Sequence, residues 1–442
     1  MRLAYFSPVS PQKTGISNFT EKELLPYLSK HADIDLFIDA GVEPTSRYLK
    51  ENFSIHCYTD YEQAKGDYDI ALYHMGNNVL HEFIYNTLLK DPGVTVLHDI
   101  YLHGFLGAIS LAKYDGQRYI DEFAHCYGPR GVEVARRAIA AGKYEAFDYP
   151  LIGRVVDHSL GVVCQSNIGI ETVLEERVGS LATKINHPFV APDAIVDQGS
   201  AEVDELKAAL GLKDKHPIIA SFGFIASHKR YRVLLEAFKK FLKGSPEAAL
   251  LLIGDDTMEI DGLIAGLGGL EGSVFRTGYI PSDRISTYVS MADFCINLRY
   301  PTAGEASGSV LNLMSMQKAV IVSNVGWFSE LPWECCLKLD PDAYEKDVLV
   351  EYMKVLTSDE QLRRNMGQNA RSYVLREHSP EEAARRYIQF IEYVLTGDDM
   401  ILGRVSREAE YLAISENDEA LLNGISDRVW DLISASRAFQ SH

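Results

Sequence analysis

The stretch Asn297-Leu-Arg-Tyr-Pro-Thr-Ala-Gly-Glu-Ala-Ser-Gly-Ser-Val-Leu-Asn312 decides the fold. It follows the apolar run Ala292–Ile296, which is typical of a buried strand, and precedes the run Lys318–Ser323, which predicts the next strand. Between the two lies a Gly-rich loop that leads into a helix. Ligands of an open α/β sheet bind beyond the carboxyl ends of the strands, so this loop is a candidate binding site.

The loop combines an anion-binding backbone with a single carboxylate. Backbone N–H groups at the start of a helix attract anions, and here they would come from Gly304, Ala306, Ser307 and Gly308. The carboxylate of Glu305 would repel an anion, so it is better suited to accept hydrogen bonds from hydroxyl groups. A phosphate and a polyol in one pocket indicate a sugar nucleotide.

Length and composition exclude several classes of protein. A chain of 442 residues is long enough for two or three domains. The formal net charge of −19 argues against non-specific nucleic-acid binding. The six cysteines are scattered without a Cys-x-x-Cys pair, which fits a reducing cytosol and does not support a zinc site. Since no run of about 18 apolar residues occurs and the first residues resemble a strand, we expect a cytoplasmic protein without a membrane span.

Short apolar runs alternate with helical stretches in two successive blocks. Runs that are continuously apolar are typical of parallel strands covered on both faces, so each block predicts a doubly wound α/β domain. We expect a first domain at 1–195, a second at 196–380 and a helical tail at 381–442. The predicted strands are Leu3–Phe6, Ile34–Ile38, Ile70–Tyr73, Val94–Leu97 and Gly161–Cys164, then Pro217–Phe222, Ala249–Ile253, Val274–Thr277, Phe294–Leu298 and Val320–Val322.

A second loop of the second domain predicts a phosphate site. The segment Ser221–Arg230 follows the first strand of that block and leads into the helical stretch Val233–Phe238. Gly223 allows a close approach of the backbone, and Lys229 supplies a cation where the helix begins. The plain alternative is a surface lysine before a helix.

The first domain offers polar side chains at the ends of three predicted strands. Gly15 lies in the loop after the first strand, where the chain turns closely. His74 and Asn77 follow a later strand, and His98 and Asp99 follow the next one. A neutral imidazole can bind a sugar hydroxyl, so we expect His98 at the donor and His74, Asn77 and Asp99 at the acceptor. The alternative is that the histidines pack beside the strands.

Two further segments are amphipathic. The segment Arg130–Lys143 predicts a basic helix that contacts either anionic lipid headgroups or an acceptor phosphate, or that only presents a solvated face. In the tail, Arg385–Val394 carries an apolar stripe that predicts packing on the first domain. The alternative is a tail that packs only on its own domain. A last helix is predicted at Leu421–Ser434.

Taken in order, these loops resemble those of the retaining glycosyltransferases of family four, which have the two-domain GT-B fold with a cleft between the domains. The resemblance covers residues 1 to about 395 and includes a Gly-Glu-x-Ser-Gly-Ser form of the donor loop at Gly304–Ser309. It implies that Lys229 holds the diphosphate, that Glu305 binds the donor sugar and that His98 reaches that sugar from the first domain. It also implies donor contacts from a larger set: Gly15, Gly223, Phe224, Gly254, Thr277, Tyr279, Ile280, Gly304, Ala306, Ser307, Gly308 and Asn312.

The sequence departs from the family pattern at two positions. The family has an arginine directly after the glycine, where this chain has Phe224, so the diphosphate charge would rest on Lys229 with help from Arg230 or Arg299. The family has a second glutamate eight residues after the first, where this chain has Leu313, and the neighbouring Asn312 is expected to hold the ribose instead. The resemblance implies no metal and no cofactor.

The resemblance implies transfer of a hexose from a nucleoside-diphosphate sugar, with GDP-mannose or a UDP-hexose as the expected donor. The acceptor would be a sugar or a lipid-linked sugar in polysaccharide, O-antigen or glycolipid assembly, with peripheral membrane contact. A sugar-nucleotide epimerase of the same fold is one alternative, and it would need paired acid and base carboxylates. A non-catalytic sugar-nucleotide-binding protein is the other, favoured by Phe224 and Asn312. A nicotinamide dehydrogenase is excluded because no Gly-x-Gly-x-x-Gly follows a first strand.

Overall fold

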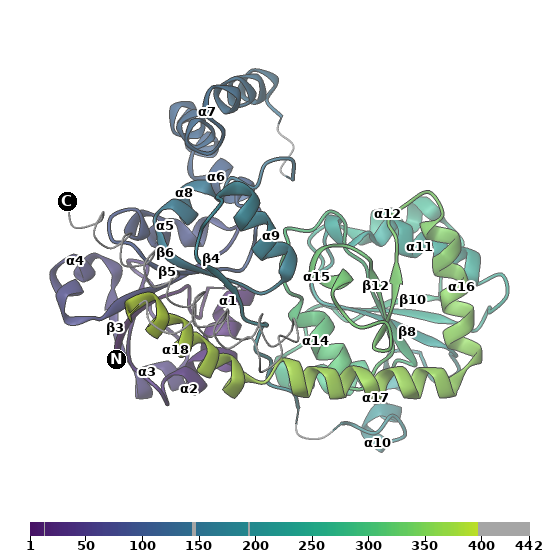
Figure 1. Cartoon of the computed structure of the whole chain (residues 1–442). Coiled ribbons are helices and arrows are strands. Elements are labelled where there is room, and N and C mark those ends of the chain that lie inside the picture. Colours follow the sequence, from purple (N-terminus) through teal and green to yellow (C-terminus); the bar gives the residue numbers. More distant parts are fainter. Residues whose placement is uncertain (13, 144–146, 193–194, 397–442) are drawn as a thin grey trace, which may run out of the picture. The chain divides into compact units, whose positions relative to one another are not determined.

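The computed structural model of the chain describes residues 1–12, 14–143, 147–192 and 195–396 (Figure 1). Within this part, residues 1–387 form one compact unit that contains two parallel sheets with helices on both faces. The predicted fold class of two Rossmann-like α/β domains is therefore confirmed. The domain boundaries at 195 and 380 stay predictions.

The first sheet has seven strands in the order β3-β2-β1-β4-β5-β6-β7. All neighbouring pairs in this sheet are parallel. The sequence did not predict β3 and β7, which are the two edge strands. The strands are β1 (Arg2–Phe6), β2 (Asp33–Ile38), β3 (Ser54–Cys57), β4 (Ile70–Met75), β5 (Gly93–Leu97), β6 (Ser159–Cys164) and β7 (Ala182–Lys184).

The second sheet has six parallel strands in the order β10-β9-β8-β11-β12-β13. The five strands predicted in the second block are present, and β13 is an additional edge strand. The strands are β8 (Ile218–Phe222), β9 (Ala249–Ile253), β10 (Val274–Arg276), β11 (Phe294–Asn297), β12 (Val320–Ser323) and β13 (Cys336–Leu339).

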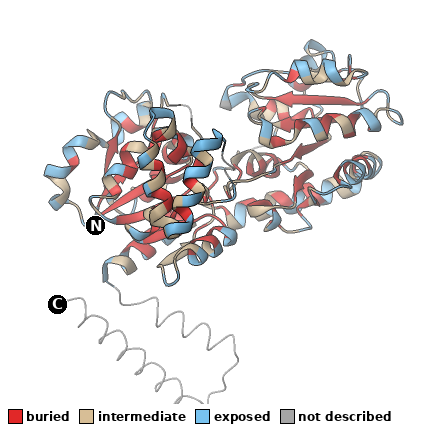
Figure 2. Cartoon of the chain, turned by 90° about the horizontal axis from the view of Figure 1, so that it is seen from above, coloured by how far each residue is buried: buried red, intermediate tan, exposed pale blue. Residues whose placement is uncertain are grey.

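Strand β9 shows why the apolar runs are continuous. Every residue of β9 is fully buried. Leu251 and Ile253 belong to the core on one face of the sheet, whereas Leu250 and Leu252 belong to the core on the other face. Figure 2 shows the same pattern across the molecule, with buried strands between helices whose outer faces are exposed. Burial of each such side chain contributes about 1.5–3 kcal/mol, so both faces of the sheet must be covered.

The helices of the first domain connect the strands of its sheet. They are α1 (Gly15–Asn18), α2 (Leu25–Leu28), α3 (Arg47–Asn52), α4 (Tyr61–Ala64), α5 (Glu82–Leu88), α6 (His103–Ile109), α7 (Gly116–Ala141), α8 (Gly153–Asp157) and α9 (Asn167–Glu176). A π-helical turn, η1 (Phe19–Leu24), joins α1 to α2.

Helix α10 (Ala201–Ala209) precedes the second sheet. The remaining helices are α11 (Tyr231–Phe241), α12 (Ile260–Leu267), α13 (Ile285–Ser290), α14 (Gly308–Ser315), α15 (Gly326–Ser329), α16 (Glu345–Ser358), α17 (Glu360–Glu377) and α18 (Pro380–Thr396). A 3-10 turn, η6 (Ser227–Lys229), precedes α11. Among the described residues, no helix is both long enough and apolar enough to cross a bilayer.

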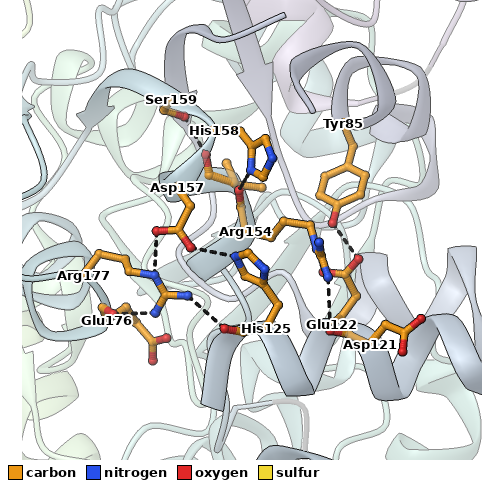
Figure 3. Close-up of polar contacts among 11 residues, drawn as sticks. Tyr85, Asp121, Glu122, His125, Arg154, Asp157, His158, Ser159, Glu176 and Arg177 are labelled. Carbon is orange, nitrogen blue, oxygen red and sulfur yellow. Dashed lines mark hydrogen bonds and ion pairs between the residues drawn. The ribbon is translucent and has the colours of Figure 1, made fainter. Parts of the chain in front are cut away.

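Helix α7 is attached to its domain by a network of charged side chains (Figure 3). Glu122 of α7 accepts hydrogen bonds from Arg154 of α8 at 2.8 Å and from Tyr85 of α5 at 2.7 Å. Asp157 of α8 binds both His125 of α7 and Arg177, each at 2.7 Å. The network holds the first half of α7 against α8 and the start of the segment after α9.

The second half of α7 contains the predicted basic segment. The backbone of Gly128 is not helical, and Pro129 follows it, so the helix is kinked there. Arg130, Arg136 and Arg137 are exposed beyond the kink. The segment is therefore helical up to Ala141, and contact with lipid or with an acceptor phosphate stays a prediction.

The described part of the tail is helical, as predicted. Tyr387 of α18 is fully buried. Burial raises the pKa of Tyr387, and Tyr5 and Cys164 of the first domain raise it further. Glu381 acts in the same way on Tyr27, whose pKa is raised first by burial. The start of α18 thus lies beside the first domain, whereas the helix predicted at Leu421–Ser434 lies outside the described residues.

Candidate functional site

Both sheets have a switch point where the strand order reverses. In the first sheet this point lies between β1 and β4, and in the second between β8 and β11. Adjacent loops leave such a point in opposite directions, which opens a crevice at the carboxyl ends of the strands. The predicted phosphate loop follows β8, and the Gly-rich loop with Glu305 follows β11. The fold therefore places both predicted loops of the second domain at one switch point.

Three glycines form the floor of this site. Gly223, Gly254 and Gly278 follow β8, β9 and β10, and all have a positive φ. A Cβ atom on Gly254 would collide with the backbone of Gly223, and Gly254 forms a β-bridge with Gly278. The close contact of the Gly223 and Gly254 backbones explains why the chain uses glycine there.

Lys229 lies directly above Gly223. A Cβ atom built on Gly223 would lie 2.5 Å from the Nζ of Lys229 and 2.7 Å from the Oγ of Ser309. The Lys229 side chain is only 6% exposed, and Nζ donates to the carbonyl oxygen of Phe222 at 3.4 Å. Burial and then the charge of Arg299 lower the pKa of Lys229 to about 7, and Glu305 opposes them. The plain alternative of a surface lysine is therefore wrong.

Arg299 pairs with the carboxylate of Glu305. Its guanidinium lies 2.9 Å from Oε1 of Glu305, while the hydroxyl of Thr302 donates to Oε2 at 2.8 Å. The Nε of Arg299 is buried and has no hydrogen-bond partner among the described residues. Glu305 is thus oriented by a cation and a hydroxyl, and one donor of Arg299 remains available to a ligand.

Arg230 was also expected to help balance the diphosphate charge, but its guanidinium has a different role. Its guanidinium binds the carboxylate of Glu345 on α16 through two nitrogens, and it lies 5.4 Å from the centre of the Tyr300 ring. These contacts fix α16 to the start of α11. The guanidinium of Arg230 is therefore engaged by Glu345, whereas Arg299 acts electrostatically on Lys229.

Helix α14 begins at Gly308, directly after the Glu305 loop. Ser307 caps this helix through its Oγ, which accepts from the N–H of Val310 at 3.3 Å. The N–H of Gly304 donates to the Oγ of Thr302 at 3.1 Å, so it is not available to an anion. Asn312 is on the same helix, and its Oδ1 is buried without a partner among the described residues. An unpaired buried acceptor of this kind is a candidate for a ligand hydroxyl.

The first domain contacts the Glu305 loop at the end of β5. The N–H of Ile100 donates to the carbonyl oxygen of Ala303 at 2.7 Å, and a Cβ atom on Gly304 would collide with the Ile100 side chain. Asp99 precedes Ile100, and its carboxylate accepts from the N–H of Asn77 at 2.7 Å. Burial and then the charge of Glu305 raise the pKa of Asp99 to about 7, while the hydrogen bond from Asn77 and the charge of Arg299 oppose this rise. Asp99 and Glu305 thus influence each other across the two domains.

The predicted histidines are buried rather than open to solvent. His74 is fully buried, and its Nδ1 lies 3.0 Å from the Nε2 of His98. The Nδ1 of His98 lies 3.3 Å from the amide nitrogen of Gln165. Asn77 uses its Oδ1 to accept from the N–H of Phe105 at 2.6 Å. His74, His98 and Asn77 therefore have partners within the protein, and their roles toward donor and acceptor stay predictions.

The other predicted donor contacts lie at the same loops. Gly15 begins α1, and a side chain there would meet open space. Phe224 and Tyr279 are exposed aromatic residues, whereas Ile280 belongs to the core. The hydroxyl of Thr277 donates to the carbonyl oxygen of Gly278 at 2.9 Å. The sequence analysis missed Thr302 and Ser309, although both lie in or next to the loop that it singled out.

With this geometry established, comparison with known proteins becomes informative. Residues 202–373 match the family model described as glycosyl transferases group 1. The matched range begins in α10, ends in α17 and contains the Lys229 and Glu305 loops. This match supports a glycosyltransferase. No curated protein matches the sequence significantly.

Solved structures of low sequence identity share the fold. HepE of Anabaena, in a complex with UDP, is 14% identical with a TM-score of 0.62, and the match covers 89% of this chain and 100% of HepE. Sucrose-phosphate synthase of Thermosynechococcus elongatus is 17% identical with a TM-score of 0.58, covering 90% and 100%. WaaG, a glycosyltransferase involved in lipopolysaccharide biosynthesis, is 14% identical with a TM-score of 0.56, covering 90% and 99%. These likenesses support the GT-B fold over both domains.

Proposed function

We propose that the protein transfers a hexose from a nucleoside-diphosphate sugar to an acceptor hydroxyl, with retention of the anomeric configuration and without a metal ion. The observation that carries the proposal is the placement of Lys229 and Ser309 beside Gly223 at the switch point of the second sheet, with Arg299 acting electrostatically on Lys229. Two cations and a hydroxyl suit a diphosphate, whose charge grows as it leaves the sugar. Groups that are fixed in place before the reaction stabilise such charge most effectively.

Glu305 is proposed to bind hydroxyl groups of the donor sugar. Arg299 and Thr302 hold its carboxylate in one orientation, and each of its oxygens retains further capacity to accept. Asn312 is proposed to accept from the ribose through its unpaired Oδ1. In this arrangement the leaving phosphate oxygen takes the proton of the acceptor hydroxyl, and attack occurs on the face that the phosphate leaves.

The first donor to test is UDP-glucose, because HepE of Anabaena has been solved in complex with it. GDP-mannose and other UDP-hexoses follow. A thermal-shift screen identifies the donor, since a ligand that binds the native state raises its apparent stability. The full chain is then incubated with that donor, with and without sugar or lipid-linked sugar acceptors, in the presence and absence of EDTA. Loss of transfer with EDTA and its return with magnesium would contradict the metal-independent part of the proposal.

The site variant Glu305→Gln is expected to fold normally and to lose most of the transfer activity. The matched control is Glu334→Gln, because Glu334 is an exposed residue of the same domain. Equal transfer rates for Glu305→Gln and the wild type would contradict the role of Glu305. A donor that stabilises the protein but is never turned over with any acceptor would favour the non-catalytic alternative.

A sugar-nucleotide epimerase is the second candidate, and one observation favours it. Asp99 and Glu305 influence each other electrostatically, and the pKa of Asp99 is about 7, raised first by burial. A neutral acid beside an ionised carboxylate is the arrangement that acid–base chemistry on a sugar requires. The donor incubated alone distinguishes the two: an epimerase converts it to its epimer without an acceptor, whereas a transferase does not.

A further inference from the structure

A continuous chain of polar side chains, buried except for the half-buried Glu23 at its end, crosses the carboxyl edge of the first sheet. It runs from His74 through His98, Gln165 and His187 to Glu23. The successive distances are 3.0 Å between His74 Nδ1 and His98 Nε2, 3.3 Å between His98 Nδ1 and the Gln165 amide nitrogen, 3.1 Å between the Gln165 amide oxygen and His187 Nδ1, and 3.0 Å between His187 Nε2 and the Glu23 carboxylate. We call these five residues the relay.

The sheet topology explains why the relay forms. His74 is in β4, His98 follows β5, Gln165 follows β6, and His187 comes shortly after β7. These four strands are neighbours in the sheet, in that order. Adjacent parallel strands lie about 4.8 Å apart, so one polar side chain at each strand end reaches the next. The relay ends at Glu23 in η1, one residue from the end of that turn.

The charge states of the histidines limit how protons can be arranged. Burial lowers the pKa of His74 to about 3 and that of His98 well below its ordinary value. Both rings are therefore neutral near pH 7, and each carries one proton on one nitrogen. Titratable groups that face His187 are Glu23 of η1, His98 at the end of β5, and His378 at the end of α17, whose Nδ1 donates to the carbonyl oxygen of His187 at 2.7 Å.

Only two arrangements then satisfy every step of the relay. When His187 is protonated, both of its nitrogens donate, to Glu23 and to the amide oxygen of Gln165. The amide nitrogen of Gln165 donates to Nδ1 of His98, so the proton of His98 must be on Nε2. When His187 is neutral, its proton stays on Nε2 facing Glu23, and Nδ1 accepts. The side-chain amide of Gln165 is then flipped, so that its oxygen rather than its nitrogen faces Nδ1 of His98. The proton of His98 must then be on Nδ1.

We propose that Gln165 and His187 are positioning residues for the sugar-transfer site, and that the proton on His187 determines which ring nitrogen of His98 is protonated. The role in transfer rests on the proposed function, whereas the proton coupling itself does not. His98 precedes Asp99, on which Glu305 acts electrostatically, and Ile100, which donates to Ala303 of the other domain, so the relay passes beside the site. His187 is also tied to the second domain, because the N–H of Phe189 donates to the carbonyl oxygen of His378 at 2.8 Å.

The test is nitrogen-15 NMR of the histidine rings in the full chain between pH 5.5 and 8.5, with signals assigned through single histidine variants. As His187 loses its proton, the proton of His98 is expected to move from Nε2 to Nδ1 with the same midpoint, while His98 stays neutral. If His187 stays charged over the whole pH range, His98 must be protonated on Nε2 at every pH. If His187 stays neutral over that range, His98 must be protonated on Nδ1 at every pH. Any other pairing overturns the proposal.

Two variants of Gln165 separate coupling from mere packing. Gln165→Leu is expected to leave His187 titrating while the tautomer of His98 no longer follows it. Gln165→Glu can only accept when ionised, so it should hold the His98 proton on Nδ1 at every pH. Gln117→Leu, at an exposed position of α7, is the control and should behave as the wild type. A tautomer change that persists in Gln165→Leu, or a wild-type behaviour of Gln165→Glu, would overturn the proposal.

Transfer activity supplies an independent readout once a donor and acceptor are known. Where the NMR data show His187 changing charge, the pH profile of kcat for the wild type is expected to show an inflection at the same pH, and Gln165→Leu should lack it. Thermal melting of each variant checks that the fold is retained. If no transfer is found with any donor, the proposed function fails, but the NMR result still decides whether the relay operates.

Discussion

The buried ammonium group of Lys229 predicts that donor binding depends steeply on pH. Burial and then Arg299 lower the pKa of Lys229 from 10.5 to about 7 in the ligand-free protein. A bound diphosphate would place negative charge beside Nζ and raise this pKa again. Above pH 7 the free protein has mostly neutral Lys229, whereas the complex has the charged form. Binding must therefore take up a proton.

The size of the effect follows from this linkage. Between the pKa of the free protein and that of the complex, the affinity falls tenfold for each unit of pH, which is about 1.4 kcal/mol. From pH 7 to pH 9 the dissociation constant should rise by up to about a hundredfold, provided that the pKa in the complex exceeds 9. Ionic strength is held constant, because screening weakens charge interactions by itself.

Isothermal titration calorimetry with an intact nucleoside-diphosphate sugar measures the effect directly. Neither phosphate of such a donor titrates in this pH range, so a proton that is taken up on binding goes to the protein. Comparison of buffers with different ionisation enthalpies at pH 8 should give uptake of close to one proton. Lys229→Arg should abolish both the uptake and the pH dependence, because arginine stays charged. Lys243→Ala, at an exposed position of the same domain, is the control. A dissociation constant that is constant within twofold from pH 7 to pH 9, without proton uptake, would refute the reasoning.

Three further predictions concern charges in the structure. Lys229→Met should raise the free energy of unfolding at pH 6 by on the order of 2–5 kcal/mol, as measured by urea denaturation. The reason is that the pKa of Lys229 in the folded state lies below its value in the unfolded state. The gain is largest below pH 7 and disappears toward pH 10.5. Arg299→Gln should weaken donor binding about tenfold or more, the scale of a lost charged hydrogen bond of about 1.5–3 kcal/mol, whereas Arg230→Gln should lower the melting temperature and leave donor affinity unchanged. Arg154→Met should cost about 3–5 kcal/mol, because it leaves the Glu122 carboxylate of Figure 3, only 7% exposed, without its cation. The double variant Arg154→Met with Glu122→Gln should recover most of that loss, and no recovery would contradict this account of the network.

Most of the fold could be predicted from the sequence, because buried parallel strands leave a direct trace. All strands that are apolar on both faces appear as continuous runs, as in Ala249–Ile253. Two of the three missed strands, Ser54–Cys57 and Ala182–Lys184, have no fully buried residue. The third, Cys336–Leu339, is four residues long and contains Lys338. The missed strands are short and lack a long continuous apolar run, so their hydrophobic signal is too weak to be distinguished from that of a loop.

The candidate site could be predicted only where its residues share a loop. Lys229 and Glu305 were found because each lies in a glycine-containing loop between a strand and a helix. The relay was not found, because His98, Gln165 and His187 are far apart in the chain and meet only after the strand order is known. The role of His98 toward the donor stays a prediction, but a strand end in a sequence does not show which neighbours its ring nitrogens will have.

The absence of an arginine at position 224 has a physical explanation in the structure. Binding a diphosphate requires a positively charged side chain near the phosphates. A residue at the end of any neighbouring strand can supply that charge. Arg299 follows β11, which is the neighbour of β8 in the sheet, and it acts electrostatically on Lys229. A cation is therefore present although the family position carries Phe224. The substitution argues against activity only if charge must come from one position of the sequence, and the geometry of the β8–β11 switch point removes that requirement.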